Sequence, residues 1–155
     1  MRSWLKRIGV LILILIVFVA MQFYRPAMDG NDTTAKLMSM DSMHDIPTSV
    51  KNVLQQSCYD CHSNQTKYPW YANLQPMRYV MDKHIMEARA ELNFDEWGAY
   101  STRKQASKLN GMMKQIEKNE MPLASYTLIH GEATLSETEK KELIDWINTI
   151  KIKYE

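Results

Sequence analysis

The feature that most constrains this 155-residue chain is a cluster of its two cysteines with a histidine directly after the second. Cys58, Cys61 and His62 occur in the stretch QQSCYDCHSNQT, residues 55–66. A Cys-x-x-Cys-His run is the attachment pattern of c-type haem. At this spacing the thiols can add to the two vinyl groups of one porphyrin, and the histidine can reach the iron as an axial ligand. The motif therefore predicts a domain that folds around one covalently attached haem c.

Three other kinds of site use closely spaced cysteines. A thioredoxin-like dithiol places its first cysteine at a helix N-terminus after a strand, whereas we expect a helix directly before Cys58. A structural zinc site needs four Cys or His ligands, and this chain has two cysteines and four scattered histidines. A disulfide between Cys58 and Cys61 needs only an oxidising compartment. Haem attachment is thus the leading interpretation, and a disulfide or redox pair stays open.

The N-terminal stretch MRSWLKRIGVLILILIVFVAMQFY has the pattern of a membrane anchor. Arg2, Lys6 and Arg7 precede an uninterrupted apolar run over residues 8–21. The neighbours of Ala20 are bulky, so the small-x-small pattern of a signal-peptidase site is missing, and we expect residues 1–24 to remain as an uncleaved span. Because the apolar run is short for a span, the core of a cleaved signal peptide is the alternative. Positive charges before a span stay in the cytoplasm. The orientation rule therefore predicts a single span in the inner (cytoplasmic) membrane, with the C-terminal domain in the periplasm.

The charge balance of the exported part narrows its partners. Three of the 19 basic residues lie in the first 24 positions, which leaves 16 basic against 18 acidic side chains beyond them. A slightly acidic domain gives no support for a nucleic-acid partner. The membrane and redox partner proteins are the partners that we expect.

Residues 25–46 are polar and lack helical periodicity, which predicts a flexible tether between anchor and domain. The tether is rich in soft donors, namely Met38, Met40, Met43 and His44. Thioether and imidazole groups can bind Cu(I) outside the cytoplasm. The simpler interpretation is a linker that happens to contain many methionines.

Four segments beyond the tether combine a helix start signal with apolar side chains at helical spacing. They follow Pro47, Pro76, Ser101 and the capping box of Ser136 and Glu139. Their apolar positions are Val50, Val53 and Leu54; Met77, Val80, Met81, Ile85, Ala88 and Leu92; Ala106, Leu109, Met112, Met113 and Ile116; and Leu143, Trp146, Ile147 and Ile150. These signals predict an all-α domain over residues 47–155.

Further side chains are candidates for contact with the haem. Met121 lies just beyond a predicted helix and is stiffened by Pro122, so its thioether is the leading candidate for the sixth iron ligand; a buried, gap-filling methionine is the alternative. His84 lies on an apolar helical face and could be an alternative ligand or a hydrogen-bonded core residue. Trp70 and Tyr71 could lie against the porphyrin or pack in the core.

Several motifs, in their order and approximate spacing, resemble the small haem-binding domain family of membrane-anchored monohaem proteins related to c-type cytochromes. They are SCYDCHSNQTKYPWY, ELNFDEW, EMPLASYTLIHGEATLS and LIDWI, and the resemblance covers roughly residues 45–152. It implies a cytochrome c-like helical domain with thioether bonds at Cys58 and Cys61. It also implies His62 as the proximal ligand and Met121 as the distal one, with His84 as a second candidate for that position.

The expected function is electron transfer by one haem in a membrane-anchored, periplasm-facing protein. We expect no enzymatic activity, because two filled axial positions leave no open site for a substrate. The alternatives are a haem-based sensor or gas-binding module with a labile sixth ligand, and a copper-binding protein that uses the methionine-rich tether.

Overall fold

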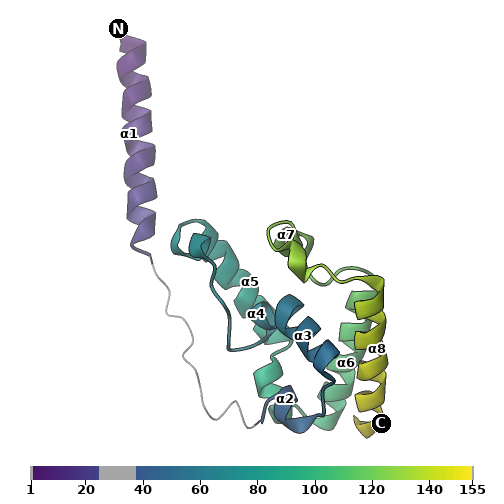
Figure 1. The fold of residues 1–155 in the computed structure, drawn as a ribbon. Coiled ribbons are helices and arrows are strands. Elements are labelled where there is room, and N and C mark those ends of the chain that lie inside the picture. Colours follow the sequence, from purple (N-terminus) through teal and green to yellow (C-terminus); the bar gives the residue numbers. More distant parts are fainter. Residues whose placement is uncertain (1, 25–37, 155) are drawn as a thin grey trace. The chain divides into compact units, whose positions relative to one another are not determined.

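The computed structural model describes residues 2–24 and 38–154, and within them every regular element is helical (Figure 1). This confirms the all-α prediction. The first part of the expected tether, residues 25–37, lies outside the described residues. The chain forms two compact units, one from Met1–Asp29 and Tyr68–His84 and the other from Gly30–Lys67 and Ile85–Glu155.

The first unit contains α1 (Arg2–Gln22), η2 (Trp70–Asn73) and the first part of α5 (Met77–Glu91). From Trp4 to Gln22, α1 is apolar enough and long enough to cross a membrane. Its apolar side chains are exposed, in keeping with a helix that has no protein core of its own.

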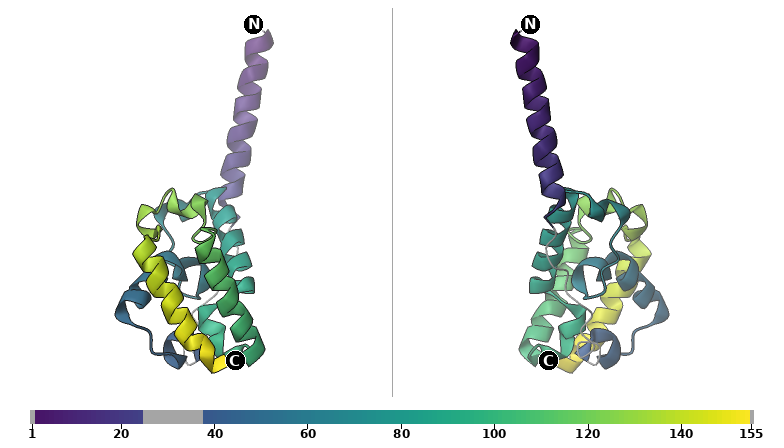
Figure 2. Two further views of the ribbon diagram at one scale, coloured as in Figure 1. Left: turned by 90° about the vertical axis from the view of Figure 1, so that its right-hand side faces the viewer. Right: turned by 90° about the vertical axis from the view of Figure 1, so that its left-hand side faces the viewer.

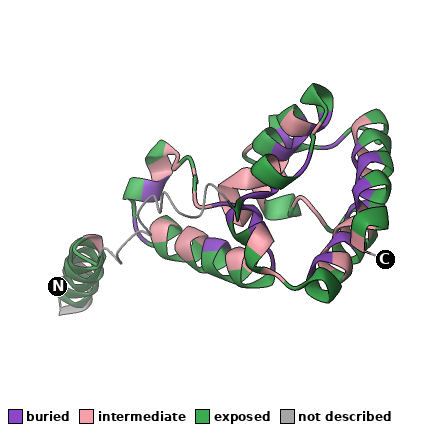
Figure 3. Cartoon of the chain, turned by 90° about the horizontal axis from the view of Figure 1, so that it is seen from below, coloured by how far each residue is buried: buried purple, intermediate pink, exposed green. Residues whose placement is uncertain are grey.

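The second unit contains the remaining helices. They are α2 (Met40–Met43), α3 (Thr48–Ser57), α4 (Tyr59–His62), η3 (Phe94–Ala99), α6 (Thr102–Glu117), α7 (Ala124–Thr127), η4 (Gly131–Ala133), α8 (Glu137–Lys151) and η5 (Ile152–Tyr154). Both α3 and α6 pack against α8, and the views in Figure 2 show α6 and α8 side by side. Figure 3 shows the buried positions along one side of α8, where Leu143, Trp146, Ile147 and Ile150 enter the core.

Local capping sets the start of two of these helices. The Ser101 hydroxyl accepts a hydrogen bond from the Lys104 amide, and α6 begins at the next residue. At α8 both bonds of the predicted capping box are present, because Ser136 bonds to the Glu139 amide and the Glu139 carboxylate accepts from Ser136. Such reciprocal bonds satisfy amides that the helix itself leaves unpaired.

The packed domain begins earlier than the predicted boundary at Pro47. Ser39 caps the short helix α2, which packs against η3, and Met40 is fully buried in the core. A Cβ atom at Gly98 would lie 2.8 Å from the Met43 sulfur, so the two segments approach closely. A flexible apolar side chain can fill a gap without any helical periodicity, which is why the sequence pattern gave no sign of this contact.

A small aromatic network holds the end of the chain against α2. The Tyr154 hydroxyl accepts a hydrogen bond from Trp97 Nε1 at 3.0 Å and lies 2.5 Å from His44 Nε2. Burial, together with the charge of Lys153, lowers the pKa of His44. His44 is therefore a neutral core residue at neutral pH.

The apolar stripe predicted on the second helix is only partly buried. Ile85 and Leu92 lie in protein interior, as expected, whereas Met77 and Val80 are exposed. These two residues belong to the small first unit, which offers few apolar neighbours. Helical periodicity identifies an apolar face, but it does not say what covers that face.

Candidate functional site

The cysteine motif forms one short helical turn directly after α3. Cys58 is both the C-cap of α3 and the N-cap of α4. Its carbonyl accepts hydrogen bonds from the amides of Cys61 at 3.2 Å and His62 at 2.9 Å. Residues three apart on a helix are neighbours on its surface. The local fold therefore presents two free thiols and an imidazole from a single turn.

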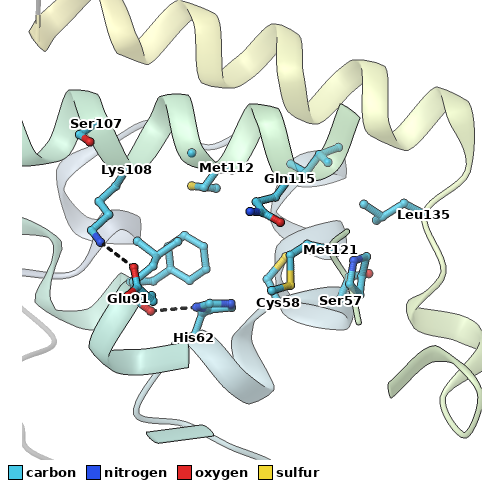
Figure 4. Close-up of a pocket in the computed structure, with 15 residues that line it drawn as sticks. Ser57, Cys58, His62, Glu91, Ser107, Lys108, Met112, Gln115, Met121 and Leu135 are labelled. Atoms are coloured by element: carbon cyan, nitrogen blue, oxygen red, sulfur yellow. Dashed lines mark hydrogen bonds and ion pairs between the residues drawn. The ribbon is translucent and has the colours of Figure 1, made fainter. Parts of the chain in front are cut away.

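A cavity of about 450 Å³ lies beside this turn, within the range of small-molecule sites. Figure 4 shows Cys58, His62 and Met121 around it. The rest of its lining is mostly apolar or weakly polar and comprises Ser57, Leu92, Phe94, Ser107, Gly111, Met112, Gln115, Ile116, Pro122 and Leu135, with the charged Glu91 and Lys108. Cys61 is half-buried and does not line this cavity.

The ring of His62 is oriented by a backbone hydrogen bond and by an aromatic neighbour. Its Nδ1 donates a hydrogen bond to the Leu92 carbonyl at 2.9 Å, which leaves Nε2 without the proton. Its ring lies edge-on to Phe94, with centroids 6.1 Å apart. Burial lowers the pKa of His62, although the bond to Leu92 opposes this shift. Neutral imidazole is the form that ligates a metal, and a backbone carbonyl on the other nitrogen is its usual orienting partner.

The two thiols are in their protonated form at neutral pH. Burial, followed by the charge of Cys61, raises the pKa of Cys58 to about 12. Burial and Asp60 raise the pKa of Cys61, and Arg89 opposes the shift. A catalytic dithiol needs a lowered thiol pKa, so these environments argue against the thioredoxin-like alternative.

Met121 reaches the cavity from the loop that follows α6. Asn119 follows Lys118, the C-cap of α6, with φ of 58°, a left-handed conformation that asparagine tolerates well. The amides of Glu120 and Met121 both donate to the Gln115 carbonyl, at 2.9 and 3.3 Å. The structure thus brings Met121 to the same cavity as Cys58 and His62, although 59 positions separate Met121 from His62 in the sequence.

Two features of the site carried no recognisable sequence signal. The first is Asp60, between the cysteines, whose carboxylate accepts from the Tyr126 hydroxyl at 2.9 Å and from the Lys67 amide at 3.0 Å. The second is the ion pair of Lys108 and Glu91 at the cavity, at 3.5 Å. Asp60 is one of the two unspecified positions of the motif, and Lys108 and Glu91 are ordinary charged residues. Their contacts are defined only by the folded structure.

The other predicted contacts lie outside the lining of this cavity. His84 and Trp70 are exposed, and Tyr71 is half-buried with its ring edge-on to Trp70. Their roles toward haem stay predictions.

The predicted copper donors have different environments. Met38 and Met43 are exposed, Met40 is buried in the core, and His44 Nε2 is engaged by Tyr154. In the described part of the chain, no group of three or more His, Cys, Asp or Glu side chains could hold a metal ion. Copper binding stays a prediction without structural support.

The lining suits a haem group in several respects. The cavity combines an apolar interior, an unprotonated histidine nitrogen, a thiol and a thioether. These are the ligand and attachment groups that haem iron and porphyrin accept. A family model described as a haem-binding domain matches residues 16–149. No curated protein and no solved structure matches the chain.

Proposed function

Because the chain belongs to the haem-binding domain family, we propose that it is a membrane-anchored monohaem protein that transfers electrons outside the cytoplasm. Cys58 and Cys61 would attach the porphyrin covalently, and His62 would be the proximal ligand of the iron. Met121 would supply the distal ligand. When bound, the haem supplies one-electron redox chemistry.

The observation that carries this proposal is the environment of His62. A hydrogen bond from Nδ1 to the Leu92 carbonyl leaves Nε2 unprotonated, and His62 lines the same cavity as Cys58 and Met121. One short turn therefore offers an attachment group and an oriented ligand together. A zinc site or a simple disulfide would not need this combination.

The protein's own residues would hold the cofactor and exclude water. Leu92, Phe94, Ile116 and Leu135 are buried side chains in the cavity wall and would provide an apolar surface for the porphyrin. With His62 and Met121 in both axial positions, no position would remain for a substrate. This supports an electron carrier and opposes an enzyme.

The proposed location rests on α1. Basic residues in the first turns of α1 precede its apolar run, so the start of this helix would stay in the cytoplasm and the haem domain would lie in the periplasm. Covalent haem attachment takes place on that side of the membrane, which agrees with the motif.

The test is the visible and near-infrared spectrum of protein that has matured in a host able to attach haem. We expect a low-spin ferric spectrum with a weak near-infrared sulfur-to-iron band, which Met121→Ala abolishes. Met112→Ala is the matched control, because Met112 also lines the cavity but lies within α6. A spectrum that does not respond to Met121→Ala would refute the proposed distal ligand.

A haem-based sensor or gas-binding module is the second candidate. It is favoured by the position of Met121 on a half-exposed loop, from which a thioether can withdraw. A high-spin ferric spectrum, or rapid binding of carbon monoxide by the reduced protein, would support it over the carrier. Loss of the low-spin spectrum in His84→Ala, and not in Met121→Ala, would instead identify His84 as the ligand.

A further inference from the structure

Several large apolar side chains are exposed to solvent within residues 70–80. Trp70 is 77% exposed, Met77 54%, Val80 47% and Leu74 46%. Large exposed apolar groups that lie close together along the chain commonly mark a site of contact with a partner or a membrane. Here they follow one another through η2 and the first turns of α5. We refer to residues 70–80 as the aromatic segment.

Gln75 ties the aromatic segment to the end of α1, and all the groups involved belong to the first unit. Its amide donates to the Gln22 side-chain oxygen at 3.0 Å, and its own side chain donates to the Tyr24 carbonyl at 2.8 Å. Gln75 is only 5% exposed, and its side-chain oxygen accepts from the Tyr79 amide at 3.2 Å. The segment is therefore held at the point where the apolar helix ends.

The position of these bonds along α1 indicates the depth of the segment. The apolar run ends at Met21, and the polar Gln22 follows it directly. In a membrane-spanning helix, this transition lies at the boundary between hydrocarbon and headgroups. Tryptophan and tyrosine are enriched at this level because their rings are apolar and their N–H or O–H groups are polar.

The charges of the segment are also compatible with the interface. Arg78 and Asp82 form an ion pair at 2.9 Å, and both side chains are largely buried. The guanidinium also lies 5.5 Å from the centre of the Tyr68 ring. Because these charges neutralise each other, the exposed face of the segment is mainly aromatic and aliphatic.

We propose that the aromatic segment lies in the headgroup region of the bilayer, as a second membrane contact beside the span. This inference rests on the proposed membrane insertion of α1. The bilayer is the occupant because Gln22 and Tyr24, at the end of that span, hold the segment through Gln75.

The four tryptophans of the chain allow one experiment to test both inferences. The full-length protein, labelled with 5-fluorotryptophan, is placed in nanodiscs that contain a lipid with a gadolinium chelate on its headgroup. The same lipid with lanthanum is the diamagnetic reference. Trp4 lies in α1 and reports on the span, whereas Trp97 and Trp146 belong to the second unit and lie outside the proposed contact. Trp70 reports on the aromatic segment, and Trp70→Phe assigns its signal.

We expect gadolinium to remove most of the fluorine signal of Trp4 and Trp70. Loss of the Trp4 signal with a preserved Trp70 signal would overturn the second membrane contact while leaving the span intact. Preservation of both signals would refute the span, and the second contact with it. A Trp70 signal that responds to protein concentration, and not to gadolinium, would assign the surface to a second copy of the chain and overturn the proposal.

A pair of matched variants sharpens the result. Leu74→Gln with Met77→Gln should restore much of the Trp70 signal, because the segment then loses apolar surface. Leu128→Gln with Ile129→Gln is the control, since these residues are 87% and 59% exposed but belong to the second unit. An equal effect of the two double variants would contradict a contact made by the aromatic segment itself.

Discussion

Two parts of the cavity lining, the turn with His62 and the loop with Met121, are built in different ways. On the attachment side, His62 is held by the Leu92 carbonyl and by the buried ring of Phe94. Elsewhere in the lining, Met121 lies on a half-exposed loop, and the exposed Leu123 caps the α7 helix that follows. The attachment wall is therefore a packed structure, whereas the Met121 wall is a loop held by a few hydrogen bonds.

This difference indicates which part of the cavity lining can move and which part is rigid. Buried contacts on the attachment wall resist displacement, because moving them would open cavities or leave polar groups unpaired. Loops with few buried apolar contacts open at much lower free energy. We expect the attachment wall to determine whether haem is held, and the Met121 wall to determine how readily its ligand exchanges.

The largest effect should come from removing both thiols of the Cys-x-x-Cys-His motif, through which we propose that haem is attached. Cys58→Ala with Cys61→Ala is expected to abolish the covalent link, so that all of the haem dissociates when the protein is unfolded in acid. The measurement is haem stain on a denaturing gel, with Met121→Ala as the control that keeps the covalent haem. Covalent haem in the double variant would contradict the assignment.

A packing variant on each wall gives the next largest difference. Phe94→Ala should lower the free energy of unfolding by about 3–5 kcal/mol, the usual cost of removing a buried phenylalanine. Leu123→Ala, at an exposed position beside the Met121 loop, should change it by less than about 0.5 kcal/mol. Denaturant unfolding of the two haem-loaded proteins checks this. Similar losses would show that the Met121 wall is as tightly packed as the attachment wall.

A smaller effect is expected from the bond between Asp60 and Tyr126. Tyr126→Phe removes a hydrogen bond to a carboxylate, a loss of about 1.5–3 kcal/mol where such a bond is well formed. On the proposed ligation, imidazole should displace Met121 about tenfold more readily in this variant, because α7 and the preceding loop lose a tie to the attachment turn. Imidazole titration, followed by the sulfur-to-iron band, measures the change.

Tyr154→Phe provides the control for general destabilisation. Its hydroxyl also takes part in hydrogen bonds in the second unit, but to Trp97 and His44, which do not line the cavity. This variant should lose stability without a change in imidazole affinity. Equal affinity gains in both tyrosine variants would show that the Met121 loop responds to overall stability only.

The smallest expected effect is a pH dependence of the unfolding free energy, which arises from His44, a residue that does not line the cavity. Because burial lowers the pKa of His44 in the folded protein, the unfolded chain binds the proton more readily. The stability that neutral His44 contributes is present above its ordinary pKa of 6.5 and is lost as the pH falls below this value. His44→Gln should flatten the profile of unfolding free energy over this range, whereas Met43→Leu, which keeps the histidine, should retain the slope.

Sequence patterns predicted most of the helical framework correctly. Start signals at Pro47, Ser101 and Ser136 correspond to helices that begin where expected, because capping and proline geometry act between residues close in the chain. The sequence pattern did not indicate that the last part of the predicted tether packs against the domain. Burial of Met40 depends on contact with η3, which lies more than 50 positions further along the sequence.

The candidate site was predictable to the extent that it is local. Cys58, Cys61 and His62 are identified by their spacing alone, and Met121 by its proline neighbour and the resemblance of the surrounding motif. The hydrogen bond from His62 to the Leu92 carbonyl was not predictable, because any residue can supply a backbone acceptor. The hydrogen bond between Tyr126 and Asp60 was not predictable either, because these residues are distant in the sequence.

The sequence by itself determined the helical class, the apolar N-terminal helix and the attachment motif, since each depends on periodicity, length or spacing within a short stretch. The tertiary structure decided which groups line the cavity, which nitrogen of His62 carries the proton, and that the first part of an apolar helical stripe stays exposed. The physical reason is that burial and hydrogen-bond partners come from segments distant in the chain. Chain folding must bring these segments together before either is defined.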